Sequence, residues 1–136
     1  MGFDPTIDYP LGSRRPDLVE TPSGLALDDV TLETARAGTL VAADVRATAA
    51  TLERQAAVAR AAGRHQLAEN LERAAELTHV PDGRLLEIYT ALRPGRSTAA
   101  ELEEWACRLD VWSAPLTAAF VREAAVAYVE RGLVGA

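Results

Sequence analysis

Apolar residues recur three and four positions apart from Asp44 to the end of the chain, and no alternating apolar and polar run of strand length interrupts them. Residues three and four apart share one face of an α-helix, so this spacing predicts helices that bury one side. Five are expected, over residues 48–62, 64–77 and 81–93, from Thr98 through Leu109, and over residues 115–131. The pattern therefore predicts an all-α fold, a small helical bundle of about five helices.

The last three of these helices carry the clearest apolar stripes. The stripes are Leu85, Ile88, Tyr89 and Leu92 in the third helix, Leu102, Trp105, Ala106 and Leu109 in the fourth, and Phe120, Val121, Ala124, Ala125 and Tyr128 in the fifth. Their spacing places each set on one helix face. We expect these faces, including Tyr89 and Phe120, to form the core.

A turn joins the third and fourth helices. Pro94 disfavours helix in the residue before it, and Gly95 gives the chain the freedom to turn. Thr98 and Glu101 have the spacing of a capping box, which begins a new helix at once. The span 88–105 is therefore predicted to be an αα-hairpin with both inner faces specified.

Residues 1–43 differ from the rest, since they hold four of the seven prolines and little helical periodicity. One short helix is expected from Thr31 to Ala37, because Asp28, Asp29 and Thr31 can cap its N-terminus and Gly38 can end it. The apolar residues of the first part of this segment include Phe3, Ile7, Tyr9, Leu11, Leu18 and Val19. A tail that stays in solvent would contain fewer large apolar residues. We expect an extended, Pro-rich N-terminal arm (1–43) that lies on a surface of this chain or of a partner, followed by a helical domain (44–136).

Composition narrows the class of partner. The chain has 136 residues, the length of one domain, with 49% hydrophobic but only 5% aromatic residues, so its own core is thin. Its net charge is −6, which disfavours nucleic acid and anionic lipid, and all fourteen basic residues are arginine. No stretch has the length of a signal peptide core or a membrane span. We expect no nucleic-acid or membrane partner and a cytoplasmic protein.

No zinc pattern, phosphate loop, dinucleotide fingerprint or nucleophile elbow is present. His65 and Glu69 lie four apart on a helix but lack a third metal ligand, and Cys107 is expected to be a small packing residue. The adjacent carboxylates at 28–29 and 103–104 are expected to cap helices and stay solvated. We therefore expect no catalytic, cofactor-binding or metal-binding residue in this chain.

Arginine and tryptophan are enriched where protein interfaces concentrate their binding energy. Arg93 and Arg96 flank the turn between the third and fourth helices, and Trp112 precedes the last helix. They are either contacts with another subunit or ordinary tip residues. Together with Tyr9 and Leu11 of the arm, they are the candidate subunit-interface residues.

Several blocks of the sequence resemble one family, the small subunit of coenzyme B12-dependent diol and glycerol dehydratases. In order along nearly the whole chain, the blocks are "DYPL" (8–11), "TPSG" (21–24), "DVTLE" (29–33), "DVR" (44–46), "TLERQAAVA" (51–59), "AENLERAAEL" (68–77), "VPDGRLLEIYTALRPGRSTAAEL" (80–102) and "AAFVREAA" (118–125). The stretch 103–113 follows the family pattern least well.

The resemblance implies a dimer of three-subunit units. A large (alpha) TIM-barrel subunit would hold the 1,2-diol or glycerol, and adenosylcobalamin would lie between it and a medium (beta) subunit. Homolysis of the cobalt–carbon bond would start a radical reaction that shifts a hydroxyl, loses water and gives an aldehyde. This chain is implied to be a structural small (gamma) subunit that binds no cofactor itself.

Some diol-dehydratase small subunits carry a longer N-terminal extension associated with packing into protein microcompartments, whereas seven residues precede "DYPL" here. Encapsulation through this chain is therefore not expected, although another subunit could carry that signal. Two other interpretations stay open at this point. One is a free-standing helical adaptor that shares the fold and binds another protein, and the other is a small metalloenzyme that uses His65 and Glu69.

Overall fold

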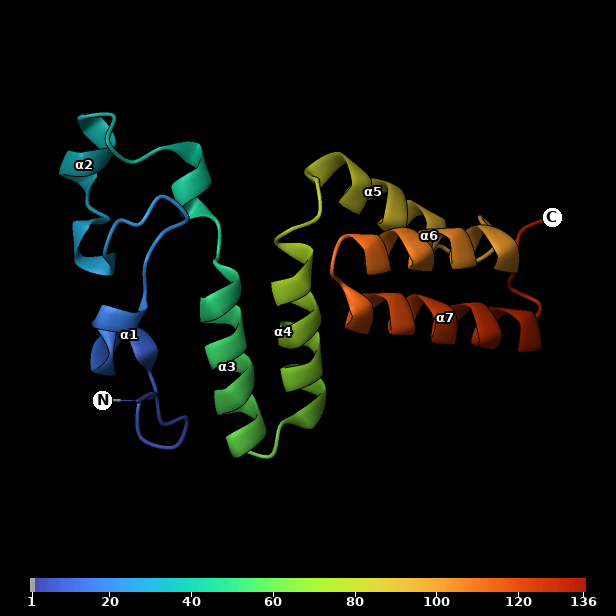
Figure 1. Ribbon diagram of the computed structural model, residues 1–136, viewed down its shortest axis with the longest axis horizontal. Coiled ribbons are helices and arrows are strands. Elements are labelled where there is room, and N and C mark those ends of the chain that lie inside the picture. Colours follow the sequence, from blue (N-terminus) through green and yellow to red (C-terminus); the bar gives the residue numbers. More distant parts are fainter. Residues whose placement is uncertain (1) are drawn as a thin grey trace. The chain divides into compact units, whose positions relative to one another are not determined.

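The computed structural model describes residues 2–136, which form helices and no β-strand beyond one isolated bridge between Glu20 and Ala26 (Figure 1). The α-helices are α1 (Leu11–Arg14), α2 (Leu32–Arg36), α3 (Ala49–Ala61), α4 (His65–Leu77), α5 (Asp82–Ala91), α6 (Ala99–Val111) and α7 (Pro115–Glu130). Short 3-10 helices span Pro16–Leu18, Leu27–Asp29 and Ala42–Val45. The predicted all-α fold is confirmed, and α3 to α7 correspond to the five expected helices.

The chain divides into two compact units, an N-terminal unit up to Ala75 and a C-terminal unit from Glu76 onward. The division falls in the last turn of α4. The boundary expected after residue 43 rests on composition and stays a prediction. No helix within residues 2–136 combines the length and the apolar character that crossing a membrane requires.

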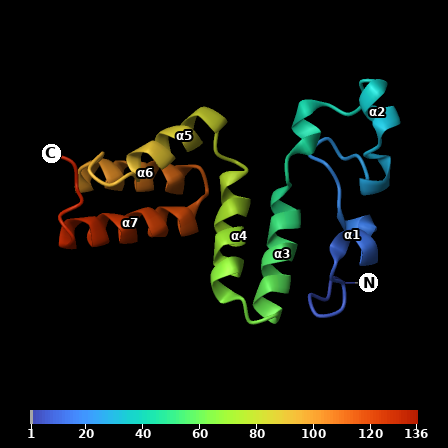
Figure 2. The same cartoon turned by 180° about the vertical axis from the view of Figure 1, so that it is seen from behind.

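In the N-terminal unit, α3 and α4 form an antiparallel hairpin, seen from both sides in Figures 1 and 2. Ala56, Ala59 and Ala68 are buried together where the two helices meet, with Leu71 packed against them. Alanine side chains let helix backbones approach closely but bury little apolar area. The α3–α4 pair therefore has a thin core, as the composition predicted.

The arm packs within the N-terminal unit. Arg54 of α3 donates a hydrogen bond to the carbonyl oxygen of Leu18 at 2.6 Å, and Leu11 is buried. The short helix α2 begins at Thr31, whose side chain accepts from the amide of Thr34, as the sequence predicted. That the arm also lies on a partner stays a prediction.

Asp44 joins two blocks of the arm. Its carboxylate accepts hydrogen bonds from the backbone amides of Ser23, at 3.2 Å, and Val41, at 2.9 Å, and the residue is 5% exposed. Bonds from the Ser23 hydroxyl and the Val41 amide, with a smaller contribution from Thr21, lower the pKa of Asp44 from 3.8 to about 2. The ionised carboxylate thus holds the "TPSG" turn against residues 41–45.

Replacing Asp44 by asparagine should loosen this part of the arm and remove its acid sensitivity. Because the folded pKa is depressed, the stabilisation by Asp44 is complete above pH 3.8 and is lost as the pH falls through about 2. Hydrogen exchange at neutral pH should show about tenfold faster exchange of the Ser23 and Val41 amides in D44N. Equal protection in both proteins, or the same acid transition in D44N, would contradict this role.

The C-terminal unit has the larger apolar core. Val80, Ile88, Leu102, Ala106, Leu109, Ala114, Ala118 and Val121 are buried together. They come from the segment before α5 and from α5, α6, α7 and the α6–α7 turn. Leu85, Leu92, Trp105, Ala125 and Tyr128 pack against this cluster. These residues confirm most of the predicted stripes.

Three predicted core positions are wrong. Tyr89 is 62% exposed, Phe120 is 42% exposed and Cys107 is exposed. Successive residues of an α-helix are rotated by about 100° around the helix axis. The first or last residue of an i, i+3, i+4 set therefore lies at the edge of the helix face that the set covers. Ile88 and Val121 lie at the centre of the buried faces of α5 and α7. Tyr89 and Phe120, their neighbours in sequence, therefore lie outside these faces.

The capping box that begins α6 is confirmed. The Thr98 hydroxyl accepts from the Glu101 amide at 3.2 Å, and the Glu101 carboxylate accepts from the Thr98 amide at 2.8 Å. Arg122 of α7 pairs with two carboxylates of α6, with Glu103 at 3.0 Å and with Asp110 at 2.9 Å. Glu103 was expected to be solvated, but it joins α6 to α7.

Candidate subunit-contact surface

The turn between α5 and α6, residues 92–98, is the α5–α6 elbow, and the end of the chain holds it in place. The Gly95 amide donates to the carbonyl oxygen of Leu133 at 2.7 Å, and the Gly135 amide donates to the carbonyl oxygen of Ser97 at 2.8 Å. A Cβ atom on Gly135 would lie 3.1 Å from backbone atoms of Arg96 and Ser97, so a larger residue would require the elbow backbone to shift. The C-terminal tail and the elbow therefore pack backbone to backbone.

The end of α5 is fixed as well. The Ser97 hydroxyl donates to the carbonyl oxygen of Ala91 at 2.9 Å, and the Tyr128 hydroxyl donates to that of Leu92 at 2.6 Å. Carbonyl groups in the last turn of a helix lack partners within the helix. Side chains from the elbow and from α7 supply the partners here, so the elbow is a fixed turn.

Opposite its buried side, α5 presents a mixed apolar and basic stripe. Leu86 is 70% exposed and Tyr89 is 62% exposed, and Arg93, one turn further on, is exposed as well. Leu86 and Tyr89 are three residues apart and share one face of α5, and Arg93 follows the end of the helix at Ala91. We call Leu86, Tyr89, Thr90, Arg93 and Arg96 the α5 outer face.

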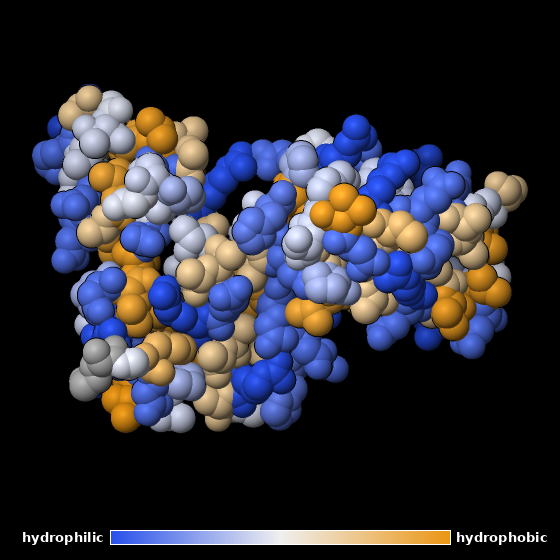
Figure 3. All heavy atoms as spheres, viewed as in Figure 1, coloured by the Kyte–Doolittle hydropathy of each residue, from blue (hydrophilic) through white to orange (hydrophobic). Residues whose placement is uncertain are grey.

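An open groove of about 420 Å³ lies along this face. It is lined by Leu86, Glu87, Thr90, Ala91, Arg96 and Ser97. The space-filling view shows apolar atoms in orange beside hydrophilic atoms in blue on the C-terminal unit (Figure 3). The groove can therefore receive a group with both an apolar and a polar part.

The α5 outer face is locally positive, although the chain carries a net charge of −6. Arg93 and Arg96 are exposed, and neither guanidinium has a polar partner among residues 2–136. Glu87, the nearby carboxylate, is paired with Arg84 at 2.7 Å. Two unpaired cations therefore remain beside Leu86 and Tyr89.

Trp112 lies elsewhere in the C-terminal unit. It is partly buried and packs against the core. A second hollow, of about 300 Å³, is lined by Trp112, Cys107, Arg108 and Val111, and Val111 is 82% exposed. Trp112 thus contributes to the core as well as to a surface hollow.

Tyr9 and Leu11 belong to the N-terminal unit and differ in exposure. Leu11 is 2% exposed, so its side chain packs inside its own unit and is not available to a partner, whereas Tyr9 is 59% exposed. Both belong to the "DYPL" block. Arg93 and Arg96 are the two candidate interface residues that the structure brings together.

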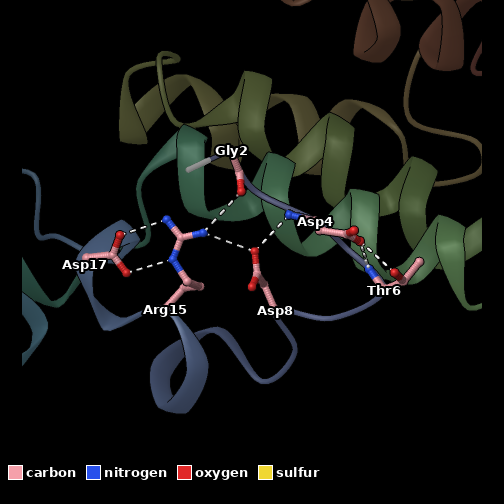
Figure 4. A network of polar contacts seen from close by, with 6 residues as sticks. All are labelled: Gly2, Asp4, Thr6, Asp8, Arg15 and Asp17. Carbon is pink, nitrogen blue, oxygen red and sulfur yellow. Dashed lines mark hydrogen bonds and ion pairs between the residues drawn. The ribbon is translucent and has the colours of Figure 1, made fainter.

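A network around Arg15 fixes the arm next to Tyr9 (Figure 4). Arg15 pairs with Asp8 at 3.1 Å and with Asp17 at 2.8 Å, and the Asp8 carboxylate also accepts from the Asp4 amide at 2.8 Å. The Arg15 guanidinium lowers the pKa of Asp17 and the two carboxylates raise the pKa of Arg15. Asp8 and Leu11 of "DYPL" therefore hold the arm, and Tyr9 points outward.

The sequence analysis did not identify Leu86, Thr90 or Gly135 as part of a surface. Leu86 lies off the predicted core stripe, and an apolar residue on the outer side of an amphipathic helix could have indicated a contact. Nothing in the sequence indicated Gly135, because its contact is with the backbone of Arg96 and Ser97, which are distant in the sequence.

The histidines form no metal site in the described chain. His65 and Glu69 are both exposed on α4. No group of three His, Cys, Asp or Glu side chains within residues 2–136 is arranged to hold a metal ion. The α4 pair thus has no third ligand.

Comparisons with known proteins agree with the resemblance found in the sequence. The family model described as dehydratase small subunit matches residues 5–134. Two similar curated proteins are named propanediol dehydratase small subunit, one from Citrobacter freundii and one from Salmonella typhimurium strain LT2. Each is 54% identical over 125 residues, which is 91% of this chain and 73% and 72% of the respective relative. The chain belongs to the dehydratase small-subunit family.

Proposed function

We propose that this chain is the non-catalytic small subunit of a diol dehydratase complex, a lyase that converts a 1,2-diol into an aldehyde with loss of water. The observation that carries this proposal is the 54% identity, over 91% of the chain, to proteins named propanediol dehydratase small subunit. Propane-1,2-diol is the proposed substrate of the complex.

The partners in this proposal are a large TIM-barrel subunit and a medium subunit, assembled as a dimer of heterotrimers in the cytoplasm. Adenosylcobalamin is assigned to those subunits. No residue of this chain is given a role toward the cofactor in this proposal.

The physical contribution of this chain is a surface for assembly. Seven of the thirteen buried hydrophobic residues in the described chain are alanine, while Leu86, Tyr89 and Val111 are each more than 60% exposed. A thin core with large apolar groups outside gains stability when a partner binds the folded state. This balance supports a subunit that is most stable in its complex.

Co-expression with the large and medium subunits tests the proposal. We expect the three chains to co-elute in size-exclusion chromatography, and we expect aldehyde formation from propane-1,2-diol with adenosylcobalamin to fall at least tenfold when this chain is omitted. The isolated chain should form no aldehyde. If it elutes alone and the activity is the same without it, the free-standing adaptor becomes the better interpretation. Family membership does not favour that alternative.

A further inference from the structure

We propose that the α5 outer face is the surface through which this chain binds a larger dehydratase subunit, with an apolar patch of that subunit on Leu86 and Tyr89 and a carboxylate on Arg93 and Arg96. This inference rests on the proposed function, because it assigns a docking surface to the small subunit. Its occupant is a segment of a larger subunit that places an acidic side chain next to apolar ones.

One side of α5 is buried in the core, and the other side exposes large apolar residues. Ile88 is buried, with Leu85 and Leu92 packed against the same core. Leu86 and Tyr89 are large apolar residues on the other side, and they are 70% and 62% exposed. Single exposed apolar residues are common, but two neighbours on one face beside an open groove form a patch that a partner can cover.

The two arginines give the patch its polarity. Arg93 and Arg96 have no polar partner in residues 2–136, in contrast to Arg15 and Arg122, which each bind two carboxylates. Guanidinium groups form planar, bidentate hydrogen bonds with carboxylates and desolvate more readily than ammonium groups. The fitting partner group is therefore a carboxylate. Nucleic acid is disfavoured by the net charge of −6.

The positions of the four residues describe the partner further. Leu86 and Tyr89 lie within α5, whereas Arg93 and Arg96 follow its end at Ala91. A partner segment that covers Leu86 and Tyr89 must therefore place its acidic group beyond the C-terminal end of α5.

The elbow is ordered before binding, which favours affinity. Arg96 lies between Gly95 and Ser97, which are both bonded to the C-terminal tail, at 2.7 and 2.8 Å. A contact on a fixed backbone avoids the entropy loss of ordering a loop during association. The tail therefore supports the backbone that carries Arg96.

The test compares two double charge reversals in the full chain, co-expressed with the large and medium subunits. R93E/R96E changes the proposed surface. R36E/R64E is the matched control, because Arg36 and Arg64 are exposed arginines of the N-terminal unit and the net charge changes from −6 to −10 in both variants. Circular dichroism verifies that both variants remain helical, and surface plasmon resonance on the purified large and medium subunits measures the affinity.

We expect R93E/R96E to bind at least a hundredfold more weakly than the unaltered chain, and R36E/R64E to bind within about threefold of it. Retained binding by R93E/R96E would overturn the inference while leaving the proposed function intact. Equal loss in both variants would also overturn it, since binding would then follow net charge. Failure of the unaltered chain to bind would overturn the proposed function itself, and this inference with it.

A second pair of variants tests the apolar part of the proposed contact surface. Tyr89→Ala should weaken binding about tenfold or more, as expected for an aromatic residue near the centre of an interface. Val126→Ala on α7, where Val126 is 60% exposed, is the control and should change affinity less than twofold. An unchanged affinity for Y89A would overturn the assignment of Tyr89 to the contact.

Discussion

Replacing Leu102 by alanine should lower the free energy of unfolding of the C-terminal unit by about 2–5 kcal/mol. Leu102 is fully buried near the N-terminal end of α6 and belongs to the core cluster with Ile88, Leu109 and Val121. Leucine and alanine have similar helix propensities, so the loss comes from packing and from the cavity that remains. In a domain stabilised by about 5–15 kcal/mol, this is a large fraction.

Urea unfolding of the full chain, followed by tryptophan fluorescence, measures this effect. The two tryptophans, Trp105 and Trp112, both pack against the core of the C-terminal unit, so their fluorescence reports on that unit alone. Leu86→Ala is the matched control, because the same atoms are removed from a side chain that is 70% exposed, and its effect should stay within about 0.5 kcal/mol. Equal midpoints for L102A and the unaltered chain would contradict the assigned core.

Replacing Glu76 by alanine should destabilise the same unit by about 1–2 kcal/mol. The Glu76 carboxylate accepts hydrogen bonds from the amides of Leu116, at 2.9 Å, and Thr117, at 2.8 Å, and from the Thr117 hydroxyl at 2.8 Å. These amides lie in the first turn of α7, where no residue of the helix can bond them. A carboxylate at this end also interacts favourably with the helix dipole.

The same fluorescence measurement distinguishes capping from a general charge effect. Glu104→Ala removes an exposed carboxylate from α6 and should change stability by less than about 0.5 kcal/mol. Glu76→Gln keeps one acceptor oxygen and should fall between the unaltered chain and E76A. A loss in E76A no larger than in E104A would show that the bonds at α7 contribute nothing measurable.

The helices were predictable because their signals are local. Thr48 and Thr98 cap α3 and α6, Pro115 begins α7, and a Pro-Gly pair separates α5 from α6. Each signal acts within one turn of backbone, so it can be read without knowledge of the rest of the fold. The family resemblance was also readable from sequence blocks alone, and the comparisons confirm it.

The candidate surface was only partly predictable. Arg93 and Arg96 were identified because arginine is enriched where protein interfaces concentrate their binding energy. Tyr89 was expected in the core and is exposed, and Leu11 was expected at an interface and is buried. Spacing defines which residues share a helix face, but it does not define where the centre of the buried arc falls.

The sequence by itself determined the all-α class, the five main helices, the turn at Pro94 and Gly95, and membership in the dehydratase small-subunit family. Only the tertiary structure showed that Glu76 caps α7 from forty residues away and that Gly135 packs on the elbow at Ser97. It also showed that Asp44 bonds the turn at Ser23. The reason is physical: helix signals lie within a few residues of one another, whereas these contacts exist only after distant segments have packed together.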